Sequence, residues 1–279
     1  MNAMSLEEAQ ELLASDDLLA IGARGDEERR RRHGTRTTFV RVLEVHVDAV
    51  PHTLPASAAA GEIRLIGRPP SIDAAVDAVS RAGSFAGDTP VTAFSLADLV
   101  DVAAGRLPEL FATLRRAGLG IIAEAPIDLL QDAAGVIRLA HDAGLMVPRV
   151  TVSAGSQDPA YVVGRVKDLQ HAVGGIRAFA PLPRTSSIAH PSTGYDDVKA
   201  IATARLLADN IDSIQVDWAL YGPKLAQVAL TMGADDVDSV SPLQGDLGRR
   251  RSPIEEIRGN ITAAGLEPVE RDGRYKLKE

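Results

Sequence analysis

The sequence predicts an α/β fold of the TIM type, a (β/α)8 barrel, preceded by a helical extension. The chain has 279 residues, which is the size of one such barrel. About eight short apolar segments alternate with helical patterns over roughly 240 residues. No glycine-rich dinucleotide or phosphate-binding motif follows any expected strand, which disfavours the alternative of a doubly wound open sheet. We therefore divide the chain into an extension, 1–35, and a barrel with a C-terminal helix and hairpin, 36–279.

The expected elements follow from apolar periodicity and from the turn residues between them. Ser5 and Glu8 form a capping-box pattern that starts the helical extension. The expected strands are 37–50, 61–67, 89–95, 119–125, 145–155, 174–183, 213–217 and 236–240. The expected helices are 71–83, 96–117 with a break at Gly105, 127–143, 159–173, 196–209, 223–233 and 253–265. Asp272-Gly273 predicts the turn of a final hairpin.

Composition narrows the possible classes of function. The net charge of −8 argues against a nucleic-acid partner bound by charge alone. No run of about eighteen apolar residues is present and the first residues are acidic, so we expect neither a membrane span nor a secretory signal. The sequence contains no cysteine, which excludes disulfides, a cysteine nucleophile and thiolate-held metal sites in this chain. We expect a cytoplasmic protein.

Three polar residues alternate along the first expected strand. Glu44, His46 and Asp48 fall on one face, while Leu43, Val45 and Val47 fall on the other. In a barrel the aliphatic face packs on helices and the polar face lines the interior. These three residues are candidates for acid–base catalysis or for binding zinc, iron or manganese. A polar lining joined by hydrogen bonds is the alternative, and we assign no metal.

Further candidates lie at the carboxyl ends of later strands, where barrels place their chemistry. Glu124 ends the fourth expected strand, and Arg149 and Arg184 lie on or just after the fifth and sixth. Either arginine suits an acidic ligand, and an internal ion pair is the alternative for Arg149.

The segment 211–238 predicts a strand, a helix and another strand. It places Asp217, Trp218 and Tyr221 at a strand end. Asp217 suits ligand binding or the N-terminus of a helix. Trp218 suits stacking on a ligand ring or packing in the core.

Several separated segments resemble the radical S-adenosylmethionine enzymes of the futalosine route to menaquinone, aminofutalosine synthase and dehypoxanthine futalosine cyclase. The segments that carry the resemblance are AHDAGL (140–145), IRAFAPLP (176–183), 196–218, 222–238 and 254–275. They cover about half the chain in the family's order. The resemblance implies a radical SAM-type barrel, complete or nearly so, and an origin in menaquinone biosynthesis.

The chain departs from that family after the first strand, where the family has a C-x3-C-x2-C motif. Here the segment reads DAVPHTLPASAAAGEIR and has no cysteine, so we expect no iron–sulfur cluster and no adenosyl radical. One hypothesis is a barrel that binds a small aromatic carboxylate or nucleoside-like ligand and performs non-radical chemistry, as a lyase or transferase, or assists a pathway enzyme. The alternatives are a metal- or acid–base-dependent enzyme using Glu44, His46 and Asp48, and a non-catalytic scaffold. Binding of S-adenosylmethionine, homo-oligomerisation and pairing with a pathway enzyme stay open.

Overall fold

A closed barrel of eight parallel strands organises the structure, which is a computed structural model that describes residues 4–53, 59–155, 158–185, 193–243 and 253–278. The strand order is β2-β3-β4-β5-β6-β7-β8-β1, and β1 also pairs with β2, which closes the ring. The predicted TIM-type barrel is confirmed. The strands are β1 (Arg36–His46), β2 (Glu62–Ile66), β3 (Val91–Ser95), β4 (Ile121–Pro126), β5 (Arg149–Ala154), β6 (Ala178–Thr185), β7 (Ser213–Asp217), β8 (Asp236–Val240) and β9 (Glu267–Glu270).

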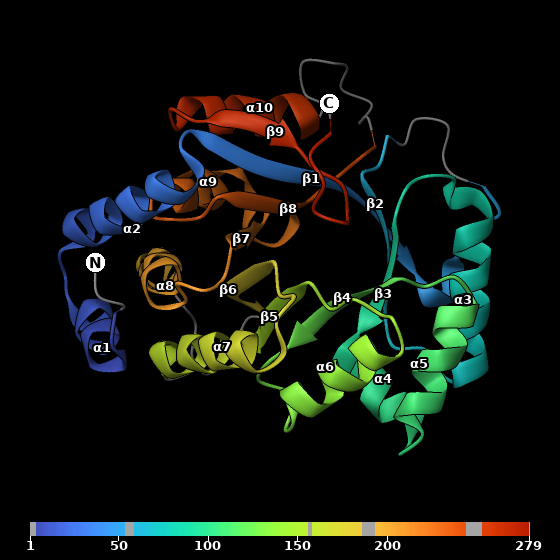
Figure 1. Ribbon diagram of the computed structural model, residues 1–279. Coiled ribbons are helices and arrows are strands. Elements are labelled where there is room, and N and C mark those ends of the chain that lie inside the picture. The colour runs from blue at the N-terminus through green and yellow to red at the C-terminus, as the bar shows by residue number, and fades with distance from the viewer. Residues whose placement is uncertain (1–3, 54–58, 156–157, 186–192, 244–252, 279) are drawn as a thin grey trace.

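Helices surround the barrel and two further helices precede it (Figure 1). The helices are α1 (Leu6–Ala14), α2 (Leu18–His33), α3 (Ile72–Ala86), α4 (Leu96–Ala103), α5 (Leu107–Arg116), α6 (Ala133–Asp142), α7 (Pro159–Val173), α8 (Gly194–Leu207), α9 (Trp218–Leu230) and α10 (Pro253–Ala263). Ser5 and Glu8 form the predicted capping box of α1. Helices α1 and α2 pack on α8, and α1 also packs on α7. No helix in the described part of the chain is long and apolar enough to cross a membrane.

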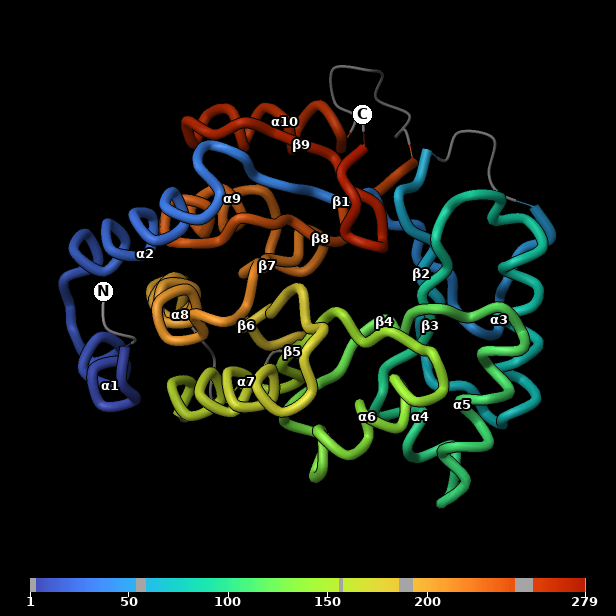
Figure 2. Tube along the Cα trace, viewed as in Figure 1, coloured from blue at the N-terminus to red at the C-terminus, as the bar shows by residue number. Residues whose placement is uncertain are grey.

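Strand β1 has three partners because it is longer than its neighbours. Its first half pairs with β9, from Arg36 with Glu267 to Phe39 with Glu270. The same half also pairs with β8, where Thr38 lies opposite Asp236. Its second half pairs with β2, from Val42 with Glu62 to His46 with Ile66. Figure 2 shows the C-terminal segment, in red, lying against the blue β1. The predicted hairpin is reduced to one antiparallel bridge, between Arg271 and Leu277, because β9 pairs with β1 instead.

Several predicted boundaries were wrong, among them the following four. Strand β1 ends at His46 and not at Val50, because residues Val47–Ala49 form a 3-10 turn. Strand β6 continues through its prolines to Thr185, with an irregular register against β5. Helix α6 starts at Ala133, where the Asp132 side chain caps it. Helix α9 starts at Trp218 and is broken at Gly222, whose φ of 72° is left-handed.

Alternation along the strands produces an apolar layer outside the barrel and a polar interior. On β1, Leu43 and Val45 are buried in the apolar core between barrel and helices, as predicted, together with Val47 of the following turn. On β2, Ile63 and Leu65 join the same core, so Glu62 and Arg64 face inward. On β8, Val237 packs outward between two aspartates. Burial of these aliphatic side chains stabilises the barrel by roughly 1.5–3 kcal/mol each.

Candidate functional site

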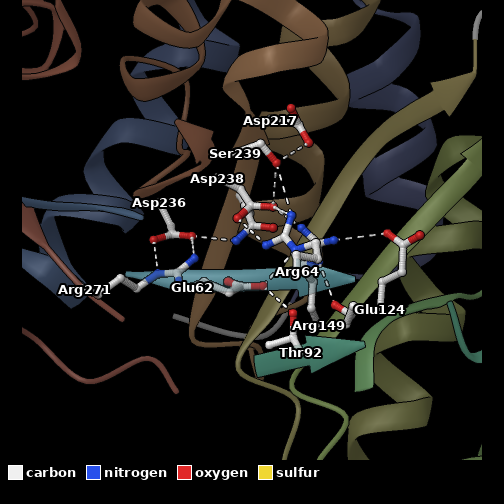
Figure 3. Close-up of polar contacts among 12 residues, drawn as sticks. Glu62, Arg64, Thr92, Glu124, Arg149, Asp217, Asp236, Asp238, Ser239 and Arg271 are labelled. Carbon is white, nitrogen blue, oxygen red and sulfur yellow. Dashed lines mark hydrogen bonds and ion pairs between the residues drawn. The ribbon is translucent and has the colours of Figure 1, made fainter. Parts of the chain in front are cut away.

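A network of charged and hydroxyl side chains lies in the barrel interior, and strands β1 to β8 all contribute to it. Figure 3 shows members from β2 to β5, β7 and β8. We call this set the barrel ionic network. Its members are Glu44, Glu62, Arg64, Thr92, Glu124, Arg149, Arg184, Asp217, Asp236, Asp238, Ser239 and Arg271. We call the end of the barrel at the strand carboxyl ends its mouth and the opposite end its floor.

Asp238 of β8 is the centre of the network. Arg64 donates two hydrogen bonds of 2.9 Å to its two carboxylate oxygens, and Arg149 donates to one of them. Burial alone would raise the pKa of Asp238, but Arg149 and Arg64 outweigh it and hold that pKa well below its usual range. A buried carboxylate is stable here only because two guanidinium groups pair with it.

Each of these arginines has a second carboxylate partner. Arg64 donates to Glu62 at 2.7 Å, and Thr92 donates to the same glutamate oxygen at 2.7 Å. Arg149 donates to the Ala123 carbonyl at 3.1 Å and to Glu124 at 3.2 Å. Both arginines are therefore held within the protein and are not available to a ligand carboxylate.

Arg184 lies across the mouth and connects two acids. Its guanidinium lies 3.4 Å from Glu124 and donates to Asp217 at 3.2 Å. Burial alone would lower the pKa of Arg184, but Glu124 and Asp217 raise it above its usual value. The Arg184 side chain is 23% exposed, so it is the arginine of the network that a ligand at the mouth can meet.

Asp217 has two roles, and one of them is structural. Its Oδ1 accepts a hydrogen bond of 3.0 Å from the Leu220 backbone N–H, which caps helix α9. Its Oδ2 accepts from Arg184 and, at 3.0 Å, from the Ser239 hydroxyl. The sequence allowed two roles for Asp217, a ligand-binding acid or a partner for a helix N-terminus. The structure shows the second role, and Asp217 still lies at the mouth.

Two non-glycine residues near the mouth have left-handed backbone conformations. Ser239 at the end of β8 has φ 57° and Phe94 near the end of β3 has φ 61°. Such residues cost roughly 1 kcal/mol or more each and tend to cluster at functional sites. The Ser239 conformation places its hydroxyl between Asp217 and Arg64, 3.1 Å from the latter.

The floor is closed by the segment after β9. Arg271 donates two hydrogen bonds of 2.7 Å to Asp236, and its guanidinium lies 4.1 Å from the centre of the Tyr275 ring. Asp236 also accepts from Thr38 at 2.5 Å and from Gln215 at 2.6 Å. These contacts fill the floor, so solvent reaches the network at the opposite end, where the Glu124 and Arg184 side chains are 19% and 23% exposed.

The three candidates from the first strand do not form one group. Glu44 lies near the mouth, where burial raises its pKa, Arg64 lowers it and Asp217 raises it. His46 accepts a hydrogen bond of 3.4 Å from the Asp48 backbone N–H and lies 3.4 Å from the Asp48 carboxylate. Asp48 belongs to the 3-10 turn and not to the strand, which explains why the predicted spacing was wrong for it.

Two aromatic candidates are used in packing. Trp218 is buried in the apolar core, so packing is favoured over ligand stacking. Tyr221 is half-buried, and its hydroxyl donates to the Pro183 carbonyl at 2.5 Å. Burial raises the pKa of Tyr221. These two residues support the wall of the mouth rather than line it.

Four important members of the network were not selected from the sequence, namely Arg64, Asp236, Asp238 and Arg271. A signal was present for the first three, because charged and aliphatic residues alternate in EIRLI and DVDSV. No local pattern indicates that Arg271 reaches back to Asp236, because that contact depends on β9 pairing with β1.

The cofactor that the family resemblance implies does not fit the residues present. A [4Fe–4S] cluster is held by cysteine thiolates, and this chain has no cysteine. Within the described residues, no three His, Asp or Glu side chains are grouped to hold a metal ion. Residues 54–58 of the segment after β1 lie outside the described residues, and their sequence, LPASA, has no thiolate or imidazole.

Comparison with known proteins gives relatives in two enzyme groups. Residues 179–279 match the family described as the CofH/MqnC C-terminal region. The aminodeoxyfutalosine synthase of Streptomyces coelicolor is 30% identical over 172 residues, which cover 53% of this chain and 44% of that protein. The 5-amino-6-(D-ribitylamino)uracil–L-tyrosine 4-hydroxyphenyl transferase of Archaeoglobus fulgidus is 30% identical over 222 residues, 67% of this chain and 64% of that protein.

These matches confirm the resemblance to the radical SAM enzymes of the futalosine pathway. The chain matches less than two thirds of the length of either relative, 44% of the synthase and 64% of the transferase. Among solved structures, methylornithine synthase (PylB) is similar with a TM-score of 0.66 and 14% identity, over 95% of this chain and 94% of that one. That likeness supports the barrel fold alone, because so low an identity carries no information about chemistry.

Proposed function

We propose, starting from the match of residues 179–279 to the CofH/MqnC C-terminal region, that this chain is a radical SAM-like barrel without an iron–sulfur cluster, linked to menaquinone biosynthesis. It binds a small nucleoside-like ligand at the barrel mouth in the cytoplasm. There it performs non-radical chemistry or assists an enzyme of the pathway. The absence of cysteine from the sequence supports the cluster-free part of this proposal.

The observation that carries ligand binding is the bridge formed by Arg184 between Glu124 and Asp217 at the strand carboxyl ends. One oxygen of Glu124, Oε2, contacts both Arg149 and Arg184. Carboxylates arranged in this way accept hydrogen bonds from hydroxyl and amino groups, which nucleosides carry.

The same geometry disfavours an aromatic carboxylate, the other ligand class that the sequence suggested. The interior arginines Arg64 and Arg149 are buried and paired with carboxylates of the protein. Arg184 would have to leave both of its acids to bind a ligand carboxylate bidentately. Nucleoside-like ligands require no such rearrangement.

Calorimetric titration with adenosine and with 3-hydroxybenzoate tests the proposal. We expect adenosine to bind and 3-hydroxybenzoate not to bind. Glu124→Gln should weaken adenosine binding about tenfold, which corresponds to about 1.4 kcal/mol. Glu109→Gln, an exposed glutamate on α5, is the matched control and should leave binding unchanged. Absence of adenosine binding, or equal binding by Glu124→Gln, would contradict the proposed ligand class.

Anaerobic reconstitution with iron and sulfide tests the cluster-free part separately. After desalting, we expect less than one iron per chain and no absorbance near 400 nm. Retention of about four irons per chain, with that absorbance, would overturn it.

A further inference from the structure

The barrel ionic network has more acids than bases. Its carboxylates are Glu44, Glu62, Glu124, Asp217, Asp236 and Asp238, and its guanidinium groups are those of Arg64, Arg149, Arg184 and Arg271. Six carboxylates against four arginines leave two negative charges without a counterpart in this set. Charges removed from water are costly unless they are paired, so the interior is suited to a ligand that brings positive charge.

One of these two negative charges is located at Glu44. Every other carboxylate of the network makes an ion pair with an arginine, whereas Glu44 forms no ion pair or hydrogen bond with any described residue. The charge of Arg64 acts favourably on Glu44, but Arg64 is already bound to Glu62 and Asp238. More than a third of the Glu44 residue surface is exposed, so a ligand can reach it.

A buried polar atom gives an independent indication of a ligand. The Thr151 hydroxyl is completely shielded from solvent and has no hydrogen-bond partner in the described structure. Thr151 lies two residues after Arg149 on β5, so its side chain points into the barrel one pleat nearer the mouth. Leaving such a group unsatisfied costs about 1–3 kcal/mol, which a ligand donor would remove.

Glu44 and Thr151 lie on opposite walls of the barrel. Strands β1 and β5 are separated by three strands in either direction around the ring of eight. A ligand that contacts both must therefore span the mouth. Asp217 and Glu124, with Arg184 between them, lie along the walls that connect the two positions.

We propose that the mouth binds a nucleoside-like ligand carrying a protonated primary amine, with the ammonium group at Glu44 and a hydroxyl or amino group at Thr151. This inference rests on the proposed function and specifies the ligand's charge. The ammonium group provides one of the two missing positive charges, and its N–H groups donate to an acid that has no other partner among the described residues.

A matched pair of ligands tests the inference. We would titrate the protein calorimetrically at pH 7.5 with adenosine and with 5′-amino-5′-deoxyadenosine, which differ by one amine in place of one hydroxyl. We expect the amine to bind at least tenfold more tightly. In Glu44→Gln the preference for the amine should fall below twofold. Glu11→Gln, an exposed glutamate on α1, should keep the full preference.

The outcomes separate this inference from the proposed function. Equal binding of the two nucleosides by the wild type, or an unchanged preference in Glu44→Gln, would overturn the ammonium site and leave nucleoside binding intact. Absence of binding by either nucleoside would overturn the proposed function itself. Circular dichroism and melting of Glu44→Gln establish that the variant is folded.

Thr151→Val tests the opposite wall, since it removes the hydroxyl with little change of shape. We expect it to weaken both nucleosides by the same factor, about three- to tenfold. Unchanged affinity for both would show that the Thr151 hydroxyl is satisfied by water alone, and would remove it from the site.

Discussion

Arg64 and Asp238 are 174 residues apart in the chain and form a bidentate ion pair, with two hydrogen bonds of 2.9 Å, inside the barrel. Arg64 lies on β2 and Asp238 on β8, the two strands that flank β1. Their side chains are 4% and 1% exposed. The pair therefore crosses the junction at which the first strand closes the barrel.

Replacing Arg64 by methionine should destabilise the protein strongly. Among the described residues, Glu62 would lose its one arginine partner, and Asp238 would keep only Arg149. We expect a loss of about 3–5 kcal/mol in the free energy of unfolding, because removing one partner leaves buried charge uncompensated. Urea unfolding at pH 7.5 measures it. The double variant Arg64→Met, Glu62→Gln should recover at least about 1 kcal/mol, since it also removes the acid.

The matched control is Arg106→Met, which removes an exposed arginine 3.7 Å from Glu109. An exposed pair contributes about 0–1 kcal/mol, so this variant should unfold close to the wild type. A loss as small for Arg64→Met as for Arg106→Met would contradict the role assigned to the buried pair.

Glu44→Gln should stabilise the ligand-free protein at neutral pH. The pKa of Glu44 is raised in the folded state, so ionising this group costs more in the folded protein than in the unfolded chain. The cost is absent below the unfolded pKa and develops as pH rises through the raised folded pKa. Because the group is partly exposed, we expect a gain below about 1 kcal/mol, or a melting temperature higher by up to about 4 °C.

Differential scanning calorimetry of Glu44→Gln and wild type at pH 4 and pH 7.5 measures this gain. It should be present at pH 7.5 and shrink at pH 4. A variant less stable than wild type at pH 7.5 would mean that Glu44 has a favourable partner within the protein.

Glu28 should show the opposite pH dependence. Hydrogen bonds from Arg31, against the opposing effect of burial and with a further contribution from Arg32, lower its pKa from 4.5 to about 2. A lowered folded pKa contributes stability above pH 4.5, and that stability is lost as pH falls toward 2. Glu28→Gln should therefore cost about 1–2 kcal/mol at pH 7, allowing for solvent screening of the exposed Arg31.

Urea unfolding at pH 7 and at pH 3 tests Glu28→Gln, whose deficit should be smaller at the lower pH. Glu27→Gln is its control, because Glu27 is the exposed neighbour on the same helix. Equal deficits for the two variants at pH 7 would contradict the prediction.

Substitution of Ser239 separates backbone strain from hydrogen bonding. Ser239→Ala keeps the left-handed φ of 57° and loses the contacts of the hydroxyl with Asp217 and Arg64. Ser239→Gly loses the same contacts and relieves the strain. We expect the glycine variant to be more stable than the alanine variant by about 1 kcal/mol in chemical denaturation. The reverse order, which is usual in strands, would show that no strain is stored at this position.

The sequence predicted the barrel because strand and helix periodicities are local properties. The inward face of β1 was predicted by the same reasoning, and Glu44 lies on it. Asp48 was misplaced because its backbone N–H bonds to His46 and ends the strand early, a side-chain contact that alternation does not reveal.

Pairs of residues in the site could not be predicted in this way. Arg149 and Arg184 were identified as candidates, but whether an arginine is free for a ligand depends on which acids face it across the barrel. Arg149 is already paired with Asp238, and Arg184 is already paired with Glu124 and Asp217. That information lies in strand register and barrel closure, which no short window of sequence contains.

The triple pairing of β1 sets the order in which the chain can complete its fold. The second half of β1 pairs with β2, which is synthesised soon afterward. The first half must wait for β8 and β9, and Thr38 is 198 residues from the aspartate that it contacts. At ribosomal rates this separation corresponds to roughly 10–40 s. During that interval the first half of β1 has no partner, and one of its edges stays unpaired until residues 267–270 have been made. Nascent copies on neighbouring ribosomes are therefore at risk of pairing with one another.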